Sequence, residues 1–474
     1  MRSVYPSLYV NLRTSLLLAS AILATGSVSC APDGPGATEP IIGNTVAAHA
    51  SVTDAHAIVV TNASELVGAL VPANAGRKIL VRSGTYNVTQ PLFVPDSATL
   101  AGEGEMLLDD SGLPTGFAAG TRTTLAMTAN VRGDVLTLGN GASVRDIAIE
   151  DLPGRTGSVI AVGSRDAGDS LSATITEVEI GNPNTHAIVL TGPAGCGVTV
   201  LTRNPNLGAP PGPHVGAAVS ATMTRSLIHS PSAGPGCGVF AFNFAPLASL
   251  SVDLRDNVIG GGIIANGGVS LPEAVHDSKT VVQSRGNLYR DDSPNPCVSK
   301  HVGWNLAGGS GVPAPAVIGE TSRNTLRVHS QGDRIEAFTT GILASGGRRF
   351  FGLPTAGPVT DNTIDLELIG TDLSTSSCGG ASFVTDFRMA GALVTNASLT
   401  PGDGNTVHAV IRNVSGSGTR TNFFVDALGP AGPLAPQYQG TGNRLEIAGT
   451  LQAFERTNRD IDPAPGAELF TGGK

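Results

Sequence analysis

Short segments in which apolar and polar residues alternate recur through the C-terminal part of the chain. In DNTIDLEL, residues 361–368, the apolar side chains are Ile364, Leu366 and Leu368, and acidic residues stand between them. A period of two predicts a β-strand with one buried face, whereas a helix would repeat its apolar residues every three or four positions. The same pattern returns in three other segments: RNTLRVHS (323–330), GNTVHAVI (404–411) and GNRLEIAG (442–449).

An asparagine stands just before each of these predicted strands, and the spacing of such asparagines indicates a repeat. Successive members lie 30 to 43 residues apart: Asn257, Asn287, Asn324, Asn362, Asn405 and Asn443. Weaker copies of the strand pattern begin near residues 143, 174 and 223. One short strand per repeat with glycine-rich returns favours stacked parallel coils over the four-stranded blades of a propeller. The sequence therefore predicts an all-β fold, a parallel β-helix of about ten coils.

The recurring asparagine suits the turn between the strands of a coil. Asparagine adopts left-handed backbone conformations more readily than most residues with a side chain, and stacked coils would let neighbouring amides bond in a ladder. We therefore expect the six asparagines to lie along one edge of the coil. The alternative interpretation is that Asn-Thr marks ordinary hairpin turns.

The segment from residue 61 to residue 110 has a different pattern. Asn62 with Glu65 three residues later predicts the start of a short amphipathic helix, from about Glu65 to Val71. The segment resembles the entry segment of right-handed parallel β-helix proteins of the pectin-lyase-like group. There a short helix caps the open end of the coil, before a Gly-Thr-Tyr turn and a Thr-Leu-x-Gly-x-Gly strand. The matching residues are Gly84, Thr85, Tyr86, Thr99, Leu100, Gly102 and Gly104.

Composition narrows the classes of function. The formal net charge is −9 and Lys and Arg form no cluster, which argues against nucleic acid as a partner. The chain has neither a phosphate-binding loop nor a dinucleotide-binding motif. A single Trp and five Tyr leave few aromatic side chains for stacking against sugars.

The N-terminus has the pattern of an export signal. Arg2 and Arg13 flank the start of an apolar stretch too short to span a bilayer, and small residues follow it. The pattern resembles a bacterial lipoprotein signal in which Cys30 would receive the lipid. Ser27 stands where that family usually has Leu, and ordinary cleavage near Ser29 is the alternative. We expect an exported protein, either secreted or anchored at the cell surface or outer membrane, with membrane contact only through that lipid.

These patterns divide the chain into four parts. They are a signal peptide at 1–29, a flexible tether at 30–53, the β-helix at 54–455 and a C-terminal tail at 456–474.

The cysteines support export, because an even number, which suggests disulfides, remains if Cys30 is lipidated. Cys196 and Cys237 are 41 residues apart, close to one coil, which predicts a disulfide. Cys297 and Cys378 are 81 apart, and a bridge between them would need a loop that reaches across two coils.

Stacked coils would align the outward side chains of successive strands in columns. Counting from each asparagine, the third and fifth residues point outward, which gives two columns: Arg327, Asp365, His408 and Glu446, and His329 with Glu367. One interpretation is an exterior face of matched charges. The other is a catalytic site. In it Asp365 and Glu367 act as acid and base or as metal ligands, His329 carries protons and Arg327 neutralises an acidic sugar, with His408 nearby.

A second polar group is Arg290 with Asp291 and Asp292. The alternation would bury Asp291, so we expect the strand to end early and the acidic pair to lie in a loop. There the pair would either bind Ca²⁺ or cap a turn. The chain shows no spacing of Cys or His typical of a structural metal site, and no other cofactor is expected.

The sequence favours binding over catalysis. Polysaccharide hydrolases that share the resemblance usually carry an Asn-Thr-Asp motif, but Leu326, Ile364 and Val407 follow the Asn-Thr pairs here. We therefore expect an exported surface β-helix that binds extracellular polysaccharide. Two alternatives stay open: a polysaccharide lyase, glycoside hydrolase or epimerase, and a structural or adhesive rod without a glycan ligand. Oligomeric state is not readable from these residues.

Overall fold

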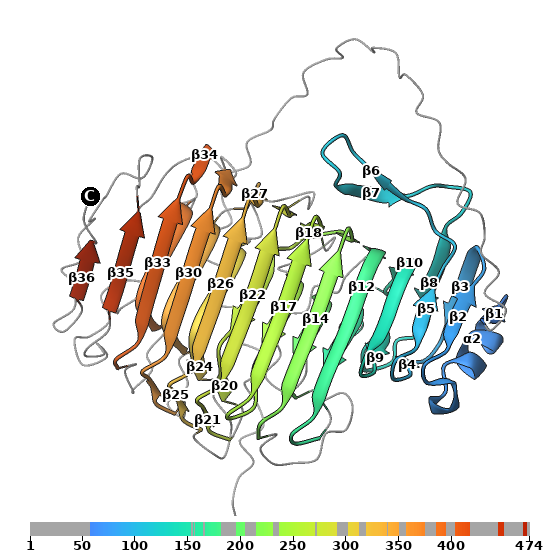
Figure 1. Ribbon diagram of the computed structural model, residues 1–474, viewed down its shortest axis with the longest axis horizontal. Helices are drawn as coiled ribbons and strands as arrows, with labels where there is room; N and C mark the ends of the chain where they lie inside the picture. The colour runs from blue at the N-terminus through green and yellow to red at the C-terminus, as the bar shows by residue number, and fades with distance from the viewer. Residues whose placement is uncertain are drawn as a thin grey trace, which may run out of the picture. The chain divides into compact units, whose positions relative to one another are not determined.

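The protein is a stack of parallel strands wound into a coil (Figure 1). The computed structural model describes residues 57–152, 155, 157–164, 166–181, 196–203, 215–230, 237–270, 273–291, 302–311, 319–338, 340–349, 357–374, 385–394, 403–417, 444–449 and 468–471. Within these ranges almost every strand pairs in parallel with a strand of the next coil, which confirms the predicted all-β parallel β-helix. No helix in the described part is long and apolar enough to cross a membrane.

Sheet A holds 21 of the described strands. Its long strands are β10 (Ala142–Glu150), β12 (Ser170–Gly181), β14 (Ala218–Thr224), β17 (Ser249–Arg255), β22 (Lys279–Arg285), β26 (Thr325–Gln331), β30 (Thr363–Ile369), β33 (Thr406–Arg412), β35 (Arg444–Gly449) and β36 (Glu468–Thr471). Its corner strands are β15 (Leu227–Ile228), β18 (Val258–Gly260), β23 (Leu288–Arg290), β27 (Arg334–Glu336), β31 (Asp372–Ser374) and β34 (Ser415–Ser417). The first coils add β1 (Ile58–Val60), β2 (Lys78–Val81), β3 (Gly84–Val88), β5 (Thr99–Ala101) and β8 (Thr123–Met127). Strand β36 extends sheet A beyond residue 455, where the sequence predicts the β-helix to end.

Sheet B closes the opposite side of the coil with ten described strands. They are β4 (Leu92–Val94), β9 (Leu136–Leu138), β11 (Ile160–Gly163), β13 (Cys196–Leu201), β16 (Cys237–Phe242), β19 (Ile263–Asn266), β20 (Val269–Ser270), β24 (Val302–Gly311), β28 (Thr340–Arg349) and β32 (Thr385–Val394). A small third sheet contains β21 (Val275–His276), β25 (Thr321–Ser322) and β29 (Val359–Thr360). An antiparallel hairpin of β6 (Met106–Leu108) and β7 (Pro114–Phe117) lies outside the coil.

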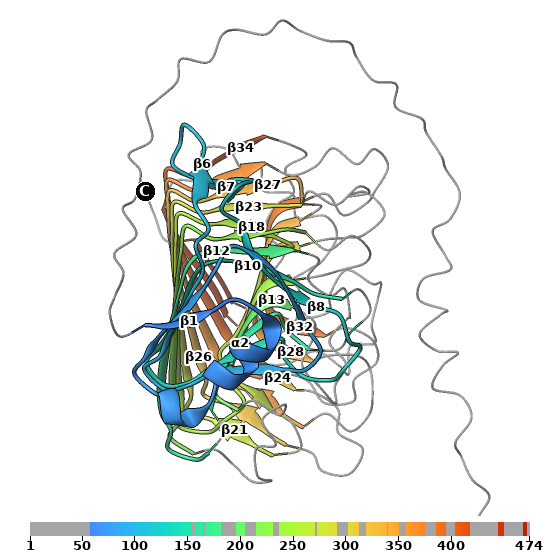
Figure 2. The same cartoon turned by 90° about the vertical axis from the view of Figure 1, so that its right-hand side faces the viewer.

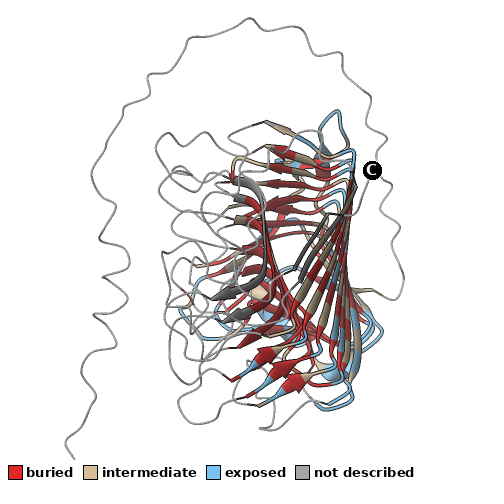
Figure 3. Cartoon of the chain, turned by 90° about the vertical axis from the view of Figure 1, so that its left-hand side faces the viewer, coloured by how far each residue is buried: buried red, intermediate tan, exposed pale blue. Residues whose placement is uncertain are grey.

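The coil is right-handed. Seen from its N-terminal end, the chain runs up the long strands of sheet A, crosses the corner strands at the top and runs down sheet B. Each successive coil lies farther from the viewer (Figures 1 and 2). Inward side chains from both sheets form one continuous apolar core. Both sheets carry many buried residues, which are red on the ribbon of Figure 3. The single tryptophan, Trp304, is fully buried in this core and cannot stack against a ligand.

The asparagines form two ladders at opposite ends of the long strands, so the prediction of a single edge is wrong. At the N-terminal ends, the Asn324 side chain donates to Asn362 and the Asn362 side chain donates to Asn405, each over 3.0 Å. At the C-terminal ends, Asn257 donates to Asn287 over 2.8 Å. At both edges a residue with positive φ precedes the asparagine and a strand follows it, which is why the sequence pattern does not separate the two ladders. Asn443 lies outside the described residues.

The left-handed residue of each turn is the one before the asparagine, not the asparagine itself. Asp256, Arg323 and Asp361 have φ near +54°, and Gly286 and Gly404 have φ of +65°. The asparagine is instead selected for its buried amide. That amide accepts a backbone N–H from the preceding coil and donates to a backbone carbonyl, as Asn362 does with Asn324 N and Thr321 O, both over 3.0 Å.

Asp333 occupies one position of the second ladder, and its replacement by asparagine should stabilise the protein. Its carboxylate is fully buried and accepts from the Asn287 side chain and from Ser330 Oγ. Burial raises the pKa of Asp333 above its usual value, although the hydrogen bonds oppose this. A carboxyl whose pKa is higher in the folded state than in the unfolded state stabilises the fold at acidic pH. This stabilisation is lost as pH rises through the folded-state pKa. Asp333→Asn should therefore raise the free energy of unfolding at pH 7, with a gain that shrinks toward pH 4 in urea titrations. An equal gain at both pH values would contradict this.

The N-terminal helix α2 (Ala63–Ala69) starts two residues earlier than predicted and precedes the short 3₁₀-helix η1 (Pro72–Asn74). Asn62 is its N-cap and accepts the Glu65 N–H over 2.9 Å, while the Glu65 carboxylate reaches back to the backbone N–H of Thr61. Leu66 and Ala69 are buried in the core, and the helix lies at the N-terminal end of the coil (Figure 2). Its role as a cap that hides the strand edges stays a prediction.

The Gly-Thr-Tyr segment is a strand and not the expected turn. Residues 84–86 open β3, which pairs with β8, and the buried Tyr86 hydroxyl donates to the carbonyls of Val60 and Arg82. The glycine of the following motif has a steric reason: a Cβ at Gly102 would stand 2.1 Å from the carbonyl oxygen of Asp146.

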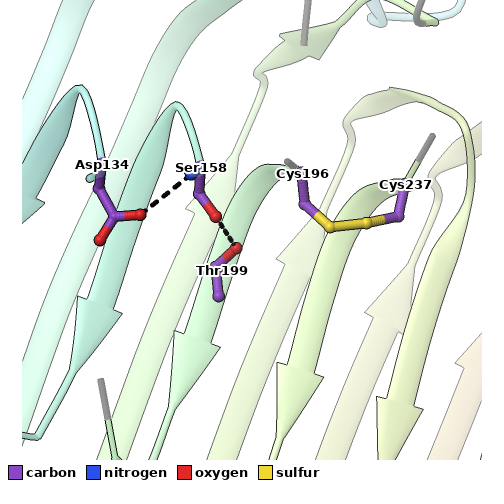
Figure 4. Close-up of a disulfide and its surroundings, with 5 residues drawn as sticks. All are labelled: Asp134, Ser158, Cys196, Thr199 and Cys237. Atoms are coloured by element: carbon purple, nitrogen blue, oxygen red, sulfur yellow. Dashed lines mark hydrogen bonds between the residues drawn. A yellow bond between two sulfur atoms is a disulfide. The ribbon is translucent and has the colours of Figure 1, made fainter. Parts of the chain in front are cut away.

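Cys196 and Cys237 form a disulfide, as the spacing predicts (Figure 4). They open β13 and β16 in direct parallel register, and their Cα atoms are 4.9 Å apart. Cys297 and Cys378 lie outside the described residues, as do Cys30, the proposed signal peptide and the tether. The same part of sheet B holds a buried hydrogen bond from the Ser158 N–H to Asp134 over 3.0 Å (Figure 4).

A buried ion pair fixes the turn that precedes β11. The Arg155 guanidinium binds both oxygens of the Asp151 carboxylate, with Nε–Oδ1 2.6 Å and Nη2–Oδ2 2.9 Å, and both side chains are fully buried. The same guanidinium donates to the carbonyls of Ser158 and Gly133, which holds two successive coils together.

Candidate functional site

The outward face of the long strands of sheet A brings the predicted site residues into columns. Arg327, Asp365, His408 and Glu446 are direct register partners on β26, β30, β33 and β35, and His329 pairs with Glu367. The inward partners of these strands, such as Leu326 and Ile364, are fully buried. The predicted alternation and the predicted columns are therefore confirmed for these strands.

Ion pairs link the charged residues of these columns from coil to coil. Arg327 Nε lies 3.0 Å from Asp365 Oδ2, and His408 Nδ1 lies 3.8 Å from Asp365 Oδ1. His329 Nδ1 lies 2.9 Å from Glu367 Oε2, and Arg412 Nη1 lies 3.6 Å from Glu367 Oε1. All five predicted catalytic residues are thus members of this charged ladder, on a face open to solvent. The geometry matches the charge-matched exterior that the sequence left as one interpretation, and their catalytic role stays a prediction.

Removing the two central carboxylates of the charged ladder should have a small effect on stability. In the Asp365→Asn, Glu367→Gln variant the fold should persist, because each exposed ion pair contributes only about 0–1 kcal/mol. The loss should shrink in high salt, where exposed charges are screened. Urea titrations at low and high salt measure both effects. A loss of several kcal/mol that salt leaves unchanged would show that these carboxylates have a structural role the face does not suggest.

The part of the same face on β12 as far as Thr176, on β14 and on the start of β17 has no outward charged residue and is rich in hydroxyl groups. We call it the hydroxyl strip, and it consists of the outward residues of β12, β14 and the start of β17: Ser170, Ser172, Thr174, Thr176, Ser220, Thr222, Thr224, Ser249 and Ser251. An open hollow of about 260 Å³ lies over it, with Leu171, Ala218 and Val219 among the apolar lining residues and Lys279 at one side. None of the site residues predicted from the sequence belongs to this strip, although the Ser-x-Thr-x-Thr alternation of residues 172–176 is a signal of it.

A second cluster, also missed from the sequence, lies at the base of the β6–β7 hairpin. Glu179 Oε1 is 3.1 Å from His229 Nε2 and 3.4 Å from Arg122 Nη2, and the same Arg122 nitrogen is 3.0 Å from Glu150. Although burial favours a higher value, His229 and Arg122 keep the pKa of the Glu179 carboxyl below its usual range. Phe117 of the hairpin donates its N–H to Glu179 over 3.3 Å. Glu150 and Glu179 lie at or near the ends of two of the weaker strand copies, and this position is the signal that the sequence offers for the cluster.

The hairpin covers an apolar row on the corner strands. Leu113 from the hairpin packs against Leu227, Val258 and Leu288, which point out of the coil on β15, β18 and β23. The Glu179 cluster therefore fastens the hairpin base, while this row holds its tip. All four charged or titratable members of the cluster have partners, and three of them are more than a third exposed.

The prediction that Asp291 lies in an exposed acidic loop is wrong. Strand β23 ends at Arg290, but Asp291 is buried and its N–H donates to the Glu336 carbonyl over 3.2 Å. The backbone hydrogen bonds between coils thus continue one residue beyond β23. Asp291 is buried, as the apolar/polar alternation of the strand would place it. Asp292 lies outside the described residues. Among the residues that the structure describes, no group of three His, Cys, Asp or Glu side chains is placed to hold a metal ion.

Comparisons with known proteins find no match in sequence and only distant similarity to solved structures. No protein-family model matches the chain, and no curated protein matches it in sequence. Among solved structures, the A-module of the mannuronan C-5 epimerase AlgE4 of Azotobacter vinelandii is 13% identical with a TM-score of 0.28, over 79% of this chain and 100% of that one. The catalytic unit of a GH87 α-1,3-glucanase from Streptomyces thermodiastaticus is 15% identical with a TM-score of 0.27, over 82% of this chain and 64% of that one. The PL6 family alginate lyase AlyGC is 10% identical with a TM-score of 0.18, over 87% and 75%.

Proposed function

We propose that this protein is exported and binds an extracellular polysaccharide along the outward face of sheet A. The observation that carries the proposal is the regular array on that face, where outward side chains, most of them polar, stand in register over eight successive long strands from β10 to β33. The array repeats at the strand spacing of about 4.8 Å, so an extended polymer lying along the coil axis would meet similar groups at each step.

Two features support export. The N-terminal pattern around Cys30 is typical of a secretion or lipoprotein signal. The Cys196–Cys237 disulfide suits an oxidising compartment, because the cytosol keeps most thiols reduced. Under this proposal a Cys30→Ser variant moves from the membrane fraction to the soluble fraction if the residue carries a lipid, and stays where it was if the protein is simply secreted.

Binding to a panel of polysaccharides tests the proposed function. The purified protein is run in native gels that contain neutral or acidic polymers, and retardation relative to a gel without polymer gives the affinity. The proposal expects retardation by at least one polymer, without new reducing ends or unsaturated uronate absorbance in matched solutions. Unchanged mobility in every gel would exclude polysaccharide binding and would favour a structural rod.

The enzyme alternative rests on the Glu179 cluster. Two carboxylates bridged by one arginine nitrogen, with a half-exposed His229 beside them, could exchange protons with a sugar bound at the hairpin base. The Asp365 and Glu367 pair is the other candidate for acid and base. If the panel gives turnover, His229→Gln should abolish it when the first site is used, and Asp365→Asn with Glu367→Gln should abolish it when the second is used.

A further inference from the structure

The hollow over the hydroxyl strip differs from the rest of the outward face. Within the described part of the chain, the hydroxyls of Ser170, Ser172, Ser249 and Ser251 make no hydrogen bond to another residue, although the hollow is lined by all four. The charged ladder shows the opposite behaviour, because Arg327, Asp365 and their neighbours satisfy one another. The fifth serine of the hollow, Ser220, donates its hydroxyl to the Leu171 carbonyl over 3.5 Å. The other four serines therefore offer donors and acceptors that the fold itself does not use.

We propose that this hollow is the binding subsite for an uncharged polysaccharide chain that lies along the coil axis. The proposal rests on the proposed function and deepens it, since it names both the part of the face and the class of polymer. Binding is placed on β12, β14 and β17, and the charged ladder on β26, β30 and β33 takes no part in it.

The lining suits a sugar ring. A serine hydroxyl both donates and accepts, as each sugar hydroxyl does, so the two sets of groups can pair without a charged partner. Beside the serines the hollow presents the outward side chains of Ala218 and Val281, against which the apolar C–H face of a pyranose can pack. The rows stand on a rigid sheet, so little freedom is lost when a ligand binds.

The register explains why the polymer would follow the axis. Ser172, Ser220 and Ser251 are direct partners on three successive strands. Neighbouring strands are about 4.8 Å apart, a step close to the advance of one ring in an extended glycan. A chain along the axis meets a hydroxyl of the same column at each step, whereas a chain along the strands would leave the hollow after one ring.

Charge argues against an acidic polymer in this hollow. Lys279 is the only charged residue among those that line it. The chain carries a formal net charge of −9, which repels a polyanion at long range. One lysine can hold one carboxylate, but a polymer with a carboxylate on each ring needs a row of cations that the strip does not have.

Valine substitutions test the subsite because valine removes the hydroxyl and is well tolerated on a strand. The Ser172→Val, Ser251→Val variant should bind a neutral polymer about tenfold or more weakly, since two hydrogen bonds to the ligand are lost. The matched control is Thr325→Val with Thr363→Val, which makes the same kind of change on β26 and β30 and should leave affinity unchanged. Lys279→Gln should also leave it nearly unchanged. Circular dichroism confirms that each variant is folded.

The probes are hydroxyethyl cellulose, laminarin and galactomannan as neutral polymers, and polygalacturonate and alginate as acidic ones. The inference expects a neutral polymer to bind, with the loss confined to the serine variant. Tighter binding of an acidic polymer, dependent on Lys279 or Arg327, would overturn the inference and leave the proposed function standing. Equal affinity of the serine variant and its control would also overturn it. Failure of every polymer to bind the wild-type protein would remove the proposed function itself.

Discussion

Asn362→Ala is expected to lower the free energy of unfolding by about 3 kcal/mol or more, because it interrupts the asparagine ladder in the middle. The side chain of Asn362 accepts the N–H of Asn324 and donates to the carbonyl of Thr321 and to the amide oxygen of Asn405. Its removal leaves the Asn324 N–H and the Asn324 side-chain amide without their acceptor, and takes one donor from the Thr321 carbonyl. Each such group costs about 1–3 kcal/mol.

Asn87→Ala is the matched control for this prediction. Asn87 is an exposed asparagine on strand β3, so its replacement should change stability by no more than about 0.5 kcal/mol. Urea titrations of both variants, followed by circular dichroism, give the comparison. Similar stability of the two variants would mean that the ladder is a consequence of the coil and not one of its supports.

Arg155→Met should also be strongly destabilising, by about 3–5 kcal/mol, because it leaves a buried carboxylate without its partner. Asp151 is fully buried and takes two hydrogen bonds from the guanidinium. Methionine fills a similar volume, so the loss measures the unpaired charge and not a cavity. The guanidinium also joins the turn to the carbonyl of Gly133 in the preceding coil.

The double variant Arg155→Met, Asp151→Leu separates charge from structure. If the unpaired carboxylate causes the loss, removal of both partners should recover much of it, since apolar replacements of buried ion pairs are often neutral or better. Arg132→Met changes an exposed arginine and should have little effect. A double variant no more stable than the single one would assign the loss to the guanidinium's bonds with the backbone carbonyls.

The fold could be predicted because its signals are local and repeated. The alternation of Ile364, Leu366 and Leu368 sets the face of each strand, and the repeat sets the stacking, so Arg327, Asp365 and His408 could be placed in one column before any coordinates. The disulfide followed from the same period. Residues that are adjacent through regular stacking are thus accessible to reasoning from the sequence.

What could not be predicted depends on contacts outside the regular repeat. The two asparagine ladders share one local motif. Only the pairing of strands shows that Asn287 and Asn324 lie at opposite ends of the long strands of sheet A. Arg122, Glu179 and His229 meet where β8, β10, β12 and β15 stack, in coils whose sequence repeat is too weak to set their register. The hairpin of residues 106–117 packs on the corner strands, and no spacing in the chain encodes that return. The unused hydroxyls of the strip became visible only once their lack of partners was known.

The central claim is that a polysaccharide binds to the outward face of sheet A. Hydroxyl-radical footprinting with a bound polysaccharide tests this claim most directly. Reporter side chains exist on several surfaces: Val281 and His408 lie on the outward face, Phe93 lies on sheet B, and Leu107 and Leu108 lie on the hairpin. A saturating neutral polymer should protect Val281, beside the hydroxyl strip, and leave Phe93 and the hairpin leucines as reactive as before. Protection confined to the hairpin, with Val281 and His408 unchanged, would contradict the account.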